Sequence, residues 1–167
     1  MILAIVLQSA PPAAPAEPWA IVSRTDAAGR PSVSASAPSI DGATRLTLRC
    51  DVPVKVVSLQ FIPKLPLGAV PDKPVSIRFD QKPSLTSDWE FPGVATFTRD
   101  QATVQLLTFN LAHAKTVELV TTTDANFQVM ARFAGPPSEQ PIRAVLAACG
   151  YTLAPTMPAA PKPEPKP

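Results

Sequence analysis

Apolar and polar residues alternate along much of the chain, and alternation predicts β-strands because successive side chains of a strand point to opposite faces. The clearest case is residues 45–50, where Leu46, Leu48 and Cys50 are expected to face the core. A second strict alternation covers residues 75–79. Further strand-like stretches occupy residues 19–23, 32–37, 54–62, 89–91, 94–97, 116–123 and 127–133. Turn residues separate these stretches, which is typical of an antiparallel sheet.

The same pattern predicts details of individual strands. Trp19 and Ile21 are two residues apart and are expected to share one face of the first strand. Phe127 is expected to point inward at the start of the last strand. The segment 63–68 contains two prolines and is expected to end the strand before it, because proline cannot donate to a ladder.

Helical spacing replaces the alternation between residues 100 and 114. Val104, Leu107 and Leu111 stand at positions i, i+3 and i+7, and no glycine or proline interrupts the segment. This spacing predicts a helix. A strand is the alternative, because residues such as Thr103 and Phe109 also suit a sheet.

A second helix is predicted between Ser138, a candidate cap, and Gly150, which suits a C-terminal stop. Its apolar stripe consists of Ile142, Val145, Leu146 and Cys149. The predicted fold is therefore α+β: a mainly antiparallel, sandwich-like β-sheet with one middle helix and one C-terminal helix packed on it. One globular domain is expected over residues 19–153, a size that can bury a sizeable core.

The two cysteines, Cys50 and Cys149, both face the predicted core, one from a strand and the other from a helix packed on the sheet. We therefore expect a disulfide between them, closing a loop of about 100 residues and stabilising the fold by about 4–5 kcal/mol. Two buried free thiols are the alternative. With a single histidine in the chain, the pair cannot form a zinc site.

Proline distinguishes both ends of the chain from the predicted domain, since ten of the 22 prolines lie outside it. Residues 154–167 are expected to form a disordered proline-rich tail. In the leader, residues 1–18, an apolar run is followed by Ala14 and Ala16, which resembles a secretory signal cleaved after Ala16. The run is too short to span a bilayer. The expected location is the periplasm or the extracellular space; a disordered N-terminus on a cytoplasmic protein is the alternative.

Composition and motifs narrow the function classes. The formal net charge of +2 is spread along the sequence, without the basic block that nucleic-acid binding requires. The chain has no nucleophile elbow, phosphate loop, dinucleotide fingerprint or metalloprotease motif, so no cofactor, metal or catalytic residue is expected. His113 is interpreted as a surface or partly packed residue. A hydrolase using Asp80, Asp88 and Glu90 remains the enzymatic alternative.

Two arginines are candidates for contact with a partner or anion. Arg49 and Arg78 each lie on the outward face of a predicted strand, and each is followed two residues later by an acid, Asp51 or Asp80. Exposed guanidinium groups bind carboxylates and phosphates in a bidentate manner. The alternative is ordinary cross-strand pairing with Asp51, Asp80 or Glu118, which stabilises little.

The order of several short motifs resembles a group of small exported bacterial proteins. The motifs are Leu-x-Leu-Arg49-Cys50, Pro74-Val-x-Ile-Arg78-x-Asp80, Trp89, Phe133-Ala-Gly135 and Leu-Ala-Ala-Cys149-Gly. They are similar to those of the type VI secretion-associated VasI/TagO-like accessory proteins and their periplasmic relatives. The resemblance implies a periplasmic, non-enzymatic domain with the Cys50–Cys149 disulfide. We therefore expect an accessory or binding protein with an envelope protein as partner; an inhibitor of a secreted hydrolase is a further alternative.

Overall fold

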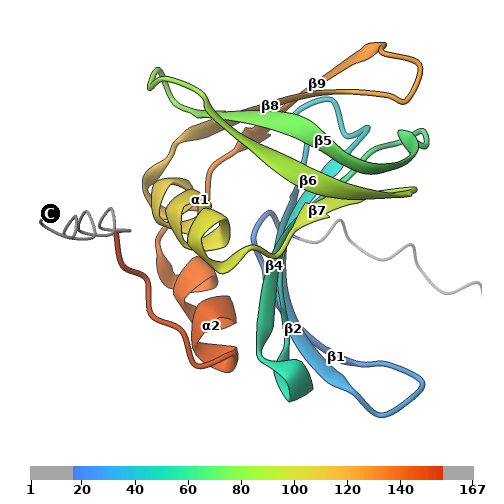
Figure 1. Ribbon diagram of the computed structural model, residues 1–167. Coiled ribbons are helices and arrows are strands. Elements are labelled where there is room, and N and C mark those ends of the chain that lie inside the picture. Colours follow the sequence, from blue (N-terminus) through green and yellow to red (C-terminus); the bar gives the residue numbers. More distant parts are fainter. Residues whose placement is uncertain (1–16, 156–167) are drawn as a thin grey trace, which may run out of the picture.

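The computed structural model describes residues 17–155 of the 167-residue chain as nine antiparallel strands and two α-helices (Figure 1). The strands are β1 (Ile21–Thr25), β2 (Pro31–Pro38), β3 (Arg45–Asp51), β4 (Val56–Ile62), β5 (Gly68–Phe79), β6 (Leu85–Gly93), β7 (Thr96–Thr98), β8 (Thr116–Thr122) and β9 (Gln128–Ala134). The helices are α1 (Gln101–His113) and α2 (Gln140–Ala148), with a 3-10 turn η1 (Val52–Val54). The predicted fold class is confirmed. The signal-like leader and the proline-rich tail fall almost entirely outside the described residues.

All nine strands belong to one sheet, in the order β1-β2-β3-β4-β7-β6-β5-β8-β9. The sandwich-like arrangement is thus a single sheet folded over. Most neighbours are joined by hairpins, but α1 carries the chain from β7 past β6 and β5 to β8. The two helices lie together on one side of the molecule (Figure 1).

The sheet curls until its two ends meet. An isolated antiparallel bridge joins Ser39, just after β2, to Phe133 of β9. Trp19 completes this seam, because its backbone N–H donates to Ser36 O at 2.7 Å and its indole Nε1–H donates to Ala134 O at 2.8 Å. The buried indole N–H thus has a hydrogen-bond acceptor 115 residues away in the sequence. Trp19 therefore belongs to the closure of the sheet.

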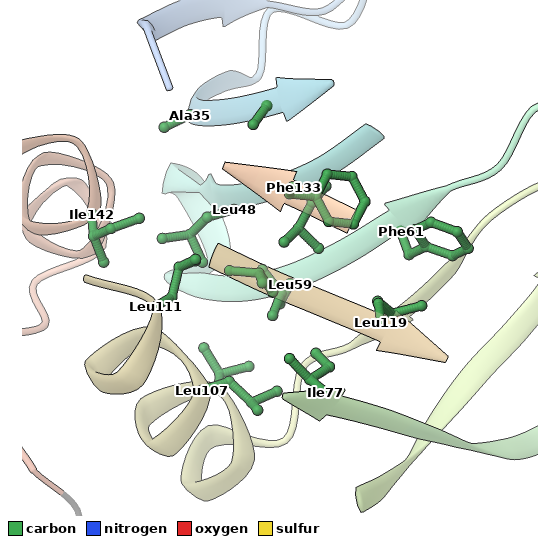
Figure 2. Packing of buried hydrophobic residues seen from close by; sticks show 14 of the residues in the cluster. Ala35, Leu48, Leu59, Phe61, Ile77, Leu107, Leu111, Leu119, Phe133 and Ile142 are labelled. Carbon is green, nitrogen blue, oxygen red and sulfur yellow. The ribbon is translucent and has the colours of Figure 1, made fainter. Parts of the chain in front are cut away.

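The core lies inside the curl, between the inward faces of the strands and the two helices. Figure 2 shows Leu107 and Leu111 of α1 pointing toward Leu59 and Ile77 of the sheet. Phe61 packs edge-on against Phe133 across the interior, with ring centroids 6.3 Å apart. The inward residues of β3, predicted from alternation, are all fully buried. Burial of this apolar surface is the main favourable term in the stability of the fold.

The segment between residues 100 and 114 is a helix, as its spacing predicts. Asp100 caps it, accepting a hydrogen bond from the backbone N–H of Thr103 at 2.9 Å. Thr108 has strand preference, but its hydroxyl donates to Val104 O one turn earlier at 2.7 Å. The residue is therefore accommodated inside the helix.

The disulfide is confirmed. Cys50 of β3 is bonded to Cys149, which ends α2, and their Cα atoms are 5.8 Å apart. Both residues are buried. The bridge therefore ties the C-terminal helix to the middle of the sheet.

Two predictions of side-chain direction are wrong. Trp19 precedes β1 with a φ of 64° and is buried, whereas Ile21 is exposed, so they do not share a strand face. Phe127 lies in the turn before β9 and is 72% exposed. In both places a turn precedes the strand, and the strand begins one or two residues later than the apolar pattern suggests.

The fifth strand begins earlier than the sequence indicates. It starts at Gly68 and runs through Pro71 and Pro74. Pro71 lies at a register shift between Val70 and Asp72, where the ladder is interrupted. The pairing of β5 with β8 begins only at Ser76, so the proline-containing half has one neighbouring strand.

None of the helices in residues 17–155 is long and apolar enough to cross a bilayer.

Candidate functional site

The two candidate arginines do not lie together. Arg49 is on β3 and Arg78 is on β5, with three strands between them in the sheet. Each has its own acid: Arg49 pairs with Asp51 at 2.7 Å, and Arg78 pairs with Glu118 of β8 at 2.7 Å. These contacts correspond to the ion-pairing alternative, and no shared anion site forms between the two guanidinium groups.

Asp80 holds a turn together. Its Oδ1 accepts hydrogen bonds from the backbone N–H groups of Thr116 and Lys115, both at 2.9 Å. These bonds lower the pKa of Asp80 below its usual value, and the bond from Thr116 has the largest effect. The residue has a φ of 53°, which closes β5 against the start of β8. Its carboxylate is therefore occupied by the backbone of the chain itself.

The three acids of the hydrolase alternative are spread along a hairpin. Asp88 is opposite Pro74 and Glu90 is opposite Asp72. These positions are six and eight residues along β5 from Asp80, or about 20 and 26 Å at ~3.3 Å per residue. Glycosidase carboxyl groups lie roughly 5 to 9.5 Å apart. Asp80 therefore cannot form a catalytic pair with either acid.

His113 joins the two helices. Its Nδ1 lies 2.7 Å from Phe109 O within α1, and its Nε2 lies 2.9 Å from an oxygen of Glu139, just before α2. Glu139 also pairs with Arg143, and that guanidinium is the main cause of its lowered pKa. His113 is thus part of a surface ion-pair cluster that fixes α2 against the end of α1.

The larger described cavity is a groove of about 390 Å³ between the first half of α1 and the start of β4. We call it the α1 groove. Its polar lining residues are Lys55, Arg99, Gln101, Gln105, Thr108, Tyr151 and Thr152, and the others are Val56, Val57, Val104, Leu146 and Gly150. Its volume lies within the range of small-molecule and peptide side-chain pockets.

The disulfide positions the wall of the α1 groove that follows α2. Gly150 comes directly after Cys149 and turns the chain with a φ of +81°, a conformation that suits glycine. Tyr151 is then held at both ends: its backbone N–H donates to Leu146 O at 3.0 Å, and its hydroxyl donates to Lys55 O at 3.2 Å. The groove thus depends on contacts between residues about 96 positions apart in sequence.

The charged groups of the α1 groove have one sign. Lys55 and Arg99 are its only charged lining residues, and no carboxylate lines it. Arg99 is held over Phe97, with 5.9 Å between Cζ and the ring centroid, by a two-point contact with Glu90 at 2.8 and 3.2 Å. Within residues 17–155, Lys55 has no acidic partner. The groove therefore combines an apolar floor with a rim on which Lys55 is unpaired and Arg99 is paired with Glu90.

A second cavity, of about 210 Å³, lies beside Arg49. Its charged lining residues are Asp26, Arg30, Arg49 and Asp51. The two arginines are paired with the two acids, at 2.8 Å for Arg30 and 2.7 Å for Arg49. All four charged groups of this cavity are paired, whereas Lys55 of the α1 groove is not, so the α1 groove is the better candidate for binding an anionic group.

The residues of the α1 groove were not found from the sequence. Arg99 precedes a helix, Lys55 follows a 3-10 turn, and Tyr151 follows the second helix. No spacing links three such positions, and only the disulfide pairing indicates that the end of α2 returns to the start of β4. Within the described residues, no group of three or more His, Cys, Asp or Glu side chains is arranged to hold a metal ion.

Comparison of the chain with protein-family models, with curated proteins and with solved structures finds no match in any of the three.

Proposed function

We propose that the chain is an exported, non-catalytic binding protein of the bacterial envelope, periplasmic or secreted, and that it holds a segment of a partner protein in the α1 groove. The observation that carries the proposal is the composition of the groove: an apolar floor beside Lys55, which has no acidic partner within residues 17–155, and Arg99, whose partner Glu90 lies outside the lining. A matching segment presents an acidic group beside an apolar side chain. Charge complementarity of this kind favours the correct partner over others.

The fold supports a binding role in two further ways. The Cys50–Cys149 bridge fits an oxidising compartment. The walls of the groove are rigid, because Tyr151 is bonded at both ends and α1 is capped by Asp100. A preformed groove binds at a lower entropic cost than a flexible one. The role implied by the resemblance to secretion-associated accessory proteins remains a prediction.

A photo-crosslinking amino acid at Gln105, inside the α1 groove, tests the binding role in the native host. We expect one crosslinked envelope protein, and we expect the adduct to fall at least tenfold in the double variant Lys55→Glu, Arg99→Glu, because both charges are reversed. The matched control places the crosslinker at Arg24 on the exposed edge strand β1. An adduct that is equally strong at Arg24, or that survives the charge reversal, contradicts the proposal.

Export is tested separately by the intact mass of the protein recovered from its native host, with and without reductant. We expect a chain that begins at Glu17 and gains two hydrogens on reduction. A full-length, reduced species would contradict export while leaving the groove untouched.

A further inference from the structure

Exposed apolar side chains gather at one end of the curled sheet. Nine large apolar residues are exposed within residues 17–155, and five of them lie at or near the turns of this end: Ile62, Leu65, Val94, Phe127 and Met130. Ile40, Leu65, Val94 and Phe127 are the most exposed of the nine, at 72–73%. Each of these four belongs to a different connection between strands. We call Leu65, Val94 and Phe127 the loop-tip surface.

Three of the four connections are neighbours in space. Ile40, in the β2–β3 turn, lies apart from Phe127, because its N–H donates to Arg132 O at 2.7 Å, near the far end of β9. In the other three connections, Leu67 N–H donates to Gly93 O at 3.2 Å, and Leu67 O accepts from Asp124 N–H at 2.8 Å. The β4–β5, β6–β7 and β8–β9 connections are therefore bonded together. Figure 1 shows these turns on the side away from the two helices.

Backbone contacts beneath the tips hold the apolar side chains outward. Leu67 is 1% exposed and anchors its loop in the core, while Leu65, two residues earlier, is 73% exposed. Lys73 of β5 donates to Thr123 O and ties the β8–β9 turn to the sheet. The loops that carry the exposed side chains are thus anchored to the sheet.

The charges at this end favour no strongly charged partner. The three connections, residues 63–67, 94–95 and 123–127, contain Lys64 and Asp124, one positive and one negative group. Neither described cavity is lined by any residue of the loop-tip surface. A protein partner binds best where an anchor residue fills a pocket. Separate apolar tips around polar loops instead suit a fluid apolar phase, in which each tip is buried independently.

We propose that the loop-tip surface inserts into the boundary between headgroups and acyl chains of a lipid bilayer. The protein then lies on the membrane through its three tips, with the polar loop backbone at the depth of the headgroups. Attachment comes from burial of apolar side chains rather than from charge, so it does not require anionic lipid. The inference goes beyond the binding role of the α1 groove and does not rest on it.

Co-sedimentation of the full chain with pure phosphatidylcholine vesicles tests the proposal. We expect binding that persists at high salt, because charge contributes little. Each of Leu65→Ser and Phe127→Ser should lower the partition coefficient about tenfold, the equivalent of 1.4 kcal/mol. The matched control is Val54→Ser, a residue 66% exposed on η1, at the other end of the sheet. An unchanged thermal midpoint in all three variants shows that the fold is intact.

Three results would overturn the inference: no binding of the unmodified chain, binding that disappears at high salt, or an equal loss in Val54→Ser. Brominated lipid gives an independent readout. Its bromine atoms should quench the emission of tryptophan in Phe127→Trp and leave that in Val54→Trp unchanged. Sedimentation velocity distinguishes membrane insertion from self-association. A dimer that Leu65→Ser abolishes would assign the surface to a second copy of the chain and overturn the proposal.

Discussion

The two ends of the curled sheet are held together by different means. At the helix-covered end, a covalent bridge, a capped helix and several ion pairs fix each element, and the α1 groove is shaped by these contacts. At the loop end, a few backbone hydrogen bonds join the turns, and the large apolar side chains point into solvent.

The residues that stabilise the domain and the exposed residues available to a partner therefore lie at different ends of the sheet. The covalent linkage and the helix packing lie at one end, whereas the most exposed large apolar side chains lie at the loop end, above a core that there includes Leu67. Exposed apolar groups gathered in this way are typical of interaction surfaces. Substitutions at the two ends should therefore have opposite signatures: unfolding at one, loss of association at the other.

Removing the disulfide gives the largest expected effect. The double variant Cys50→Ala, Cys149→Ala should lose about 4–5 kcal/mol of unfolding free energy, because its unfolded chain is no longer constrained by a loop of about 100 residues. Urea unfolding followed by circular dichroism measures the loss. A decrease below about 1 kcal/mol would show that the helix end does not depend on its bridge.

Truncating one core leucine of α1 should cost less. Leu111 is fully buried against the sheet, and Leu111→Ala should destabilise the protein by about 3 kcal/mol through lost burial and the resulting cavity. The matched variant Leu65→Ala, at an exposed loop tip, should change stability by less than about 0.5 kcal/mol. Equal effects of the two, measured by urea unfolding, would remove the distinction between the ends.

The joint between the loops can be tested at Gly68. This glycine has a φ of +84°, and a Cβ atom there would lie 2.1 Å from Cγ of Asp124 in the neighbouring turn. Gly68→Ala should therefore destabilise the loop end by about 1–3 kcal/mol and weaken vesicle binding. Gly29→Ala is the control, because its φ is also positive but nothing lies within 4 Å of the added atom. Thermal midpoints that fall equally would mean that only backbone strain matters.

The smallest effect is expected from the turn at Asp80. Its pKa is lowered in the folded state, chiefly by the Thr116 N–H, so the carboxylate contributes stability above its unfolded pKa. That contribution is lost as the pH falls through the folded pKa. Wild type should therefore melt slightly above Asp80→Asn at pH 7, and the two midpoints should converge as the pH falls below the lowered pKa of Asp80. A constant difference from pH 7 to pH 2 would contradict this assignment.

Local sequence pattern predicts the elements of this fold better than it predicts their ends. Leu46, Leu48 and Cys50 alternate because β3 is an inner strand, paired with β2 and β4 and with one face on the core, and the prediction holds. The start of β5 was missed because Pro71 and Pro74 argue against a strand. Both are accommodated by a bulge and a missing neighbour, features of tertiary pairing that no local pattern records.

The residues of the candidate site are even harder to predict from local sequence pattern than the ends of the strands. Arg49, Arg78 and Asp80 stand out in the sequence as exposed charges on regular strands, and the structure gives each a partner within the chain. Lys55 and Arg99 do not stand out, since their significance comes from lying on one rim. That Lys55 and Arg99 share a cavity depends on the pairing of β4 with β7, and the wall that completes it depends on how α2 returns to the sheet over nearly 100 residues.

The seam at Trp19 has a consequence for how the chain folds. Its indole bonds to Ala134, and the disulfide joins Cys50 to Cys149, so both closures connect an early part of the chain with a late one. A chain emerging from its N-terminus can complete neither until nearly the whole domain is available. Because such distant contacts slow folding, we expect a high contact order and a single late, cooperative step in which the sheet closes.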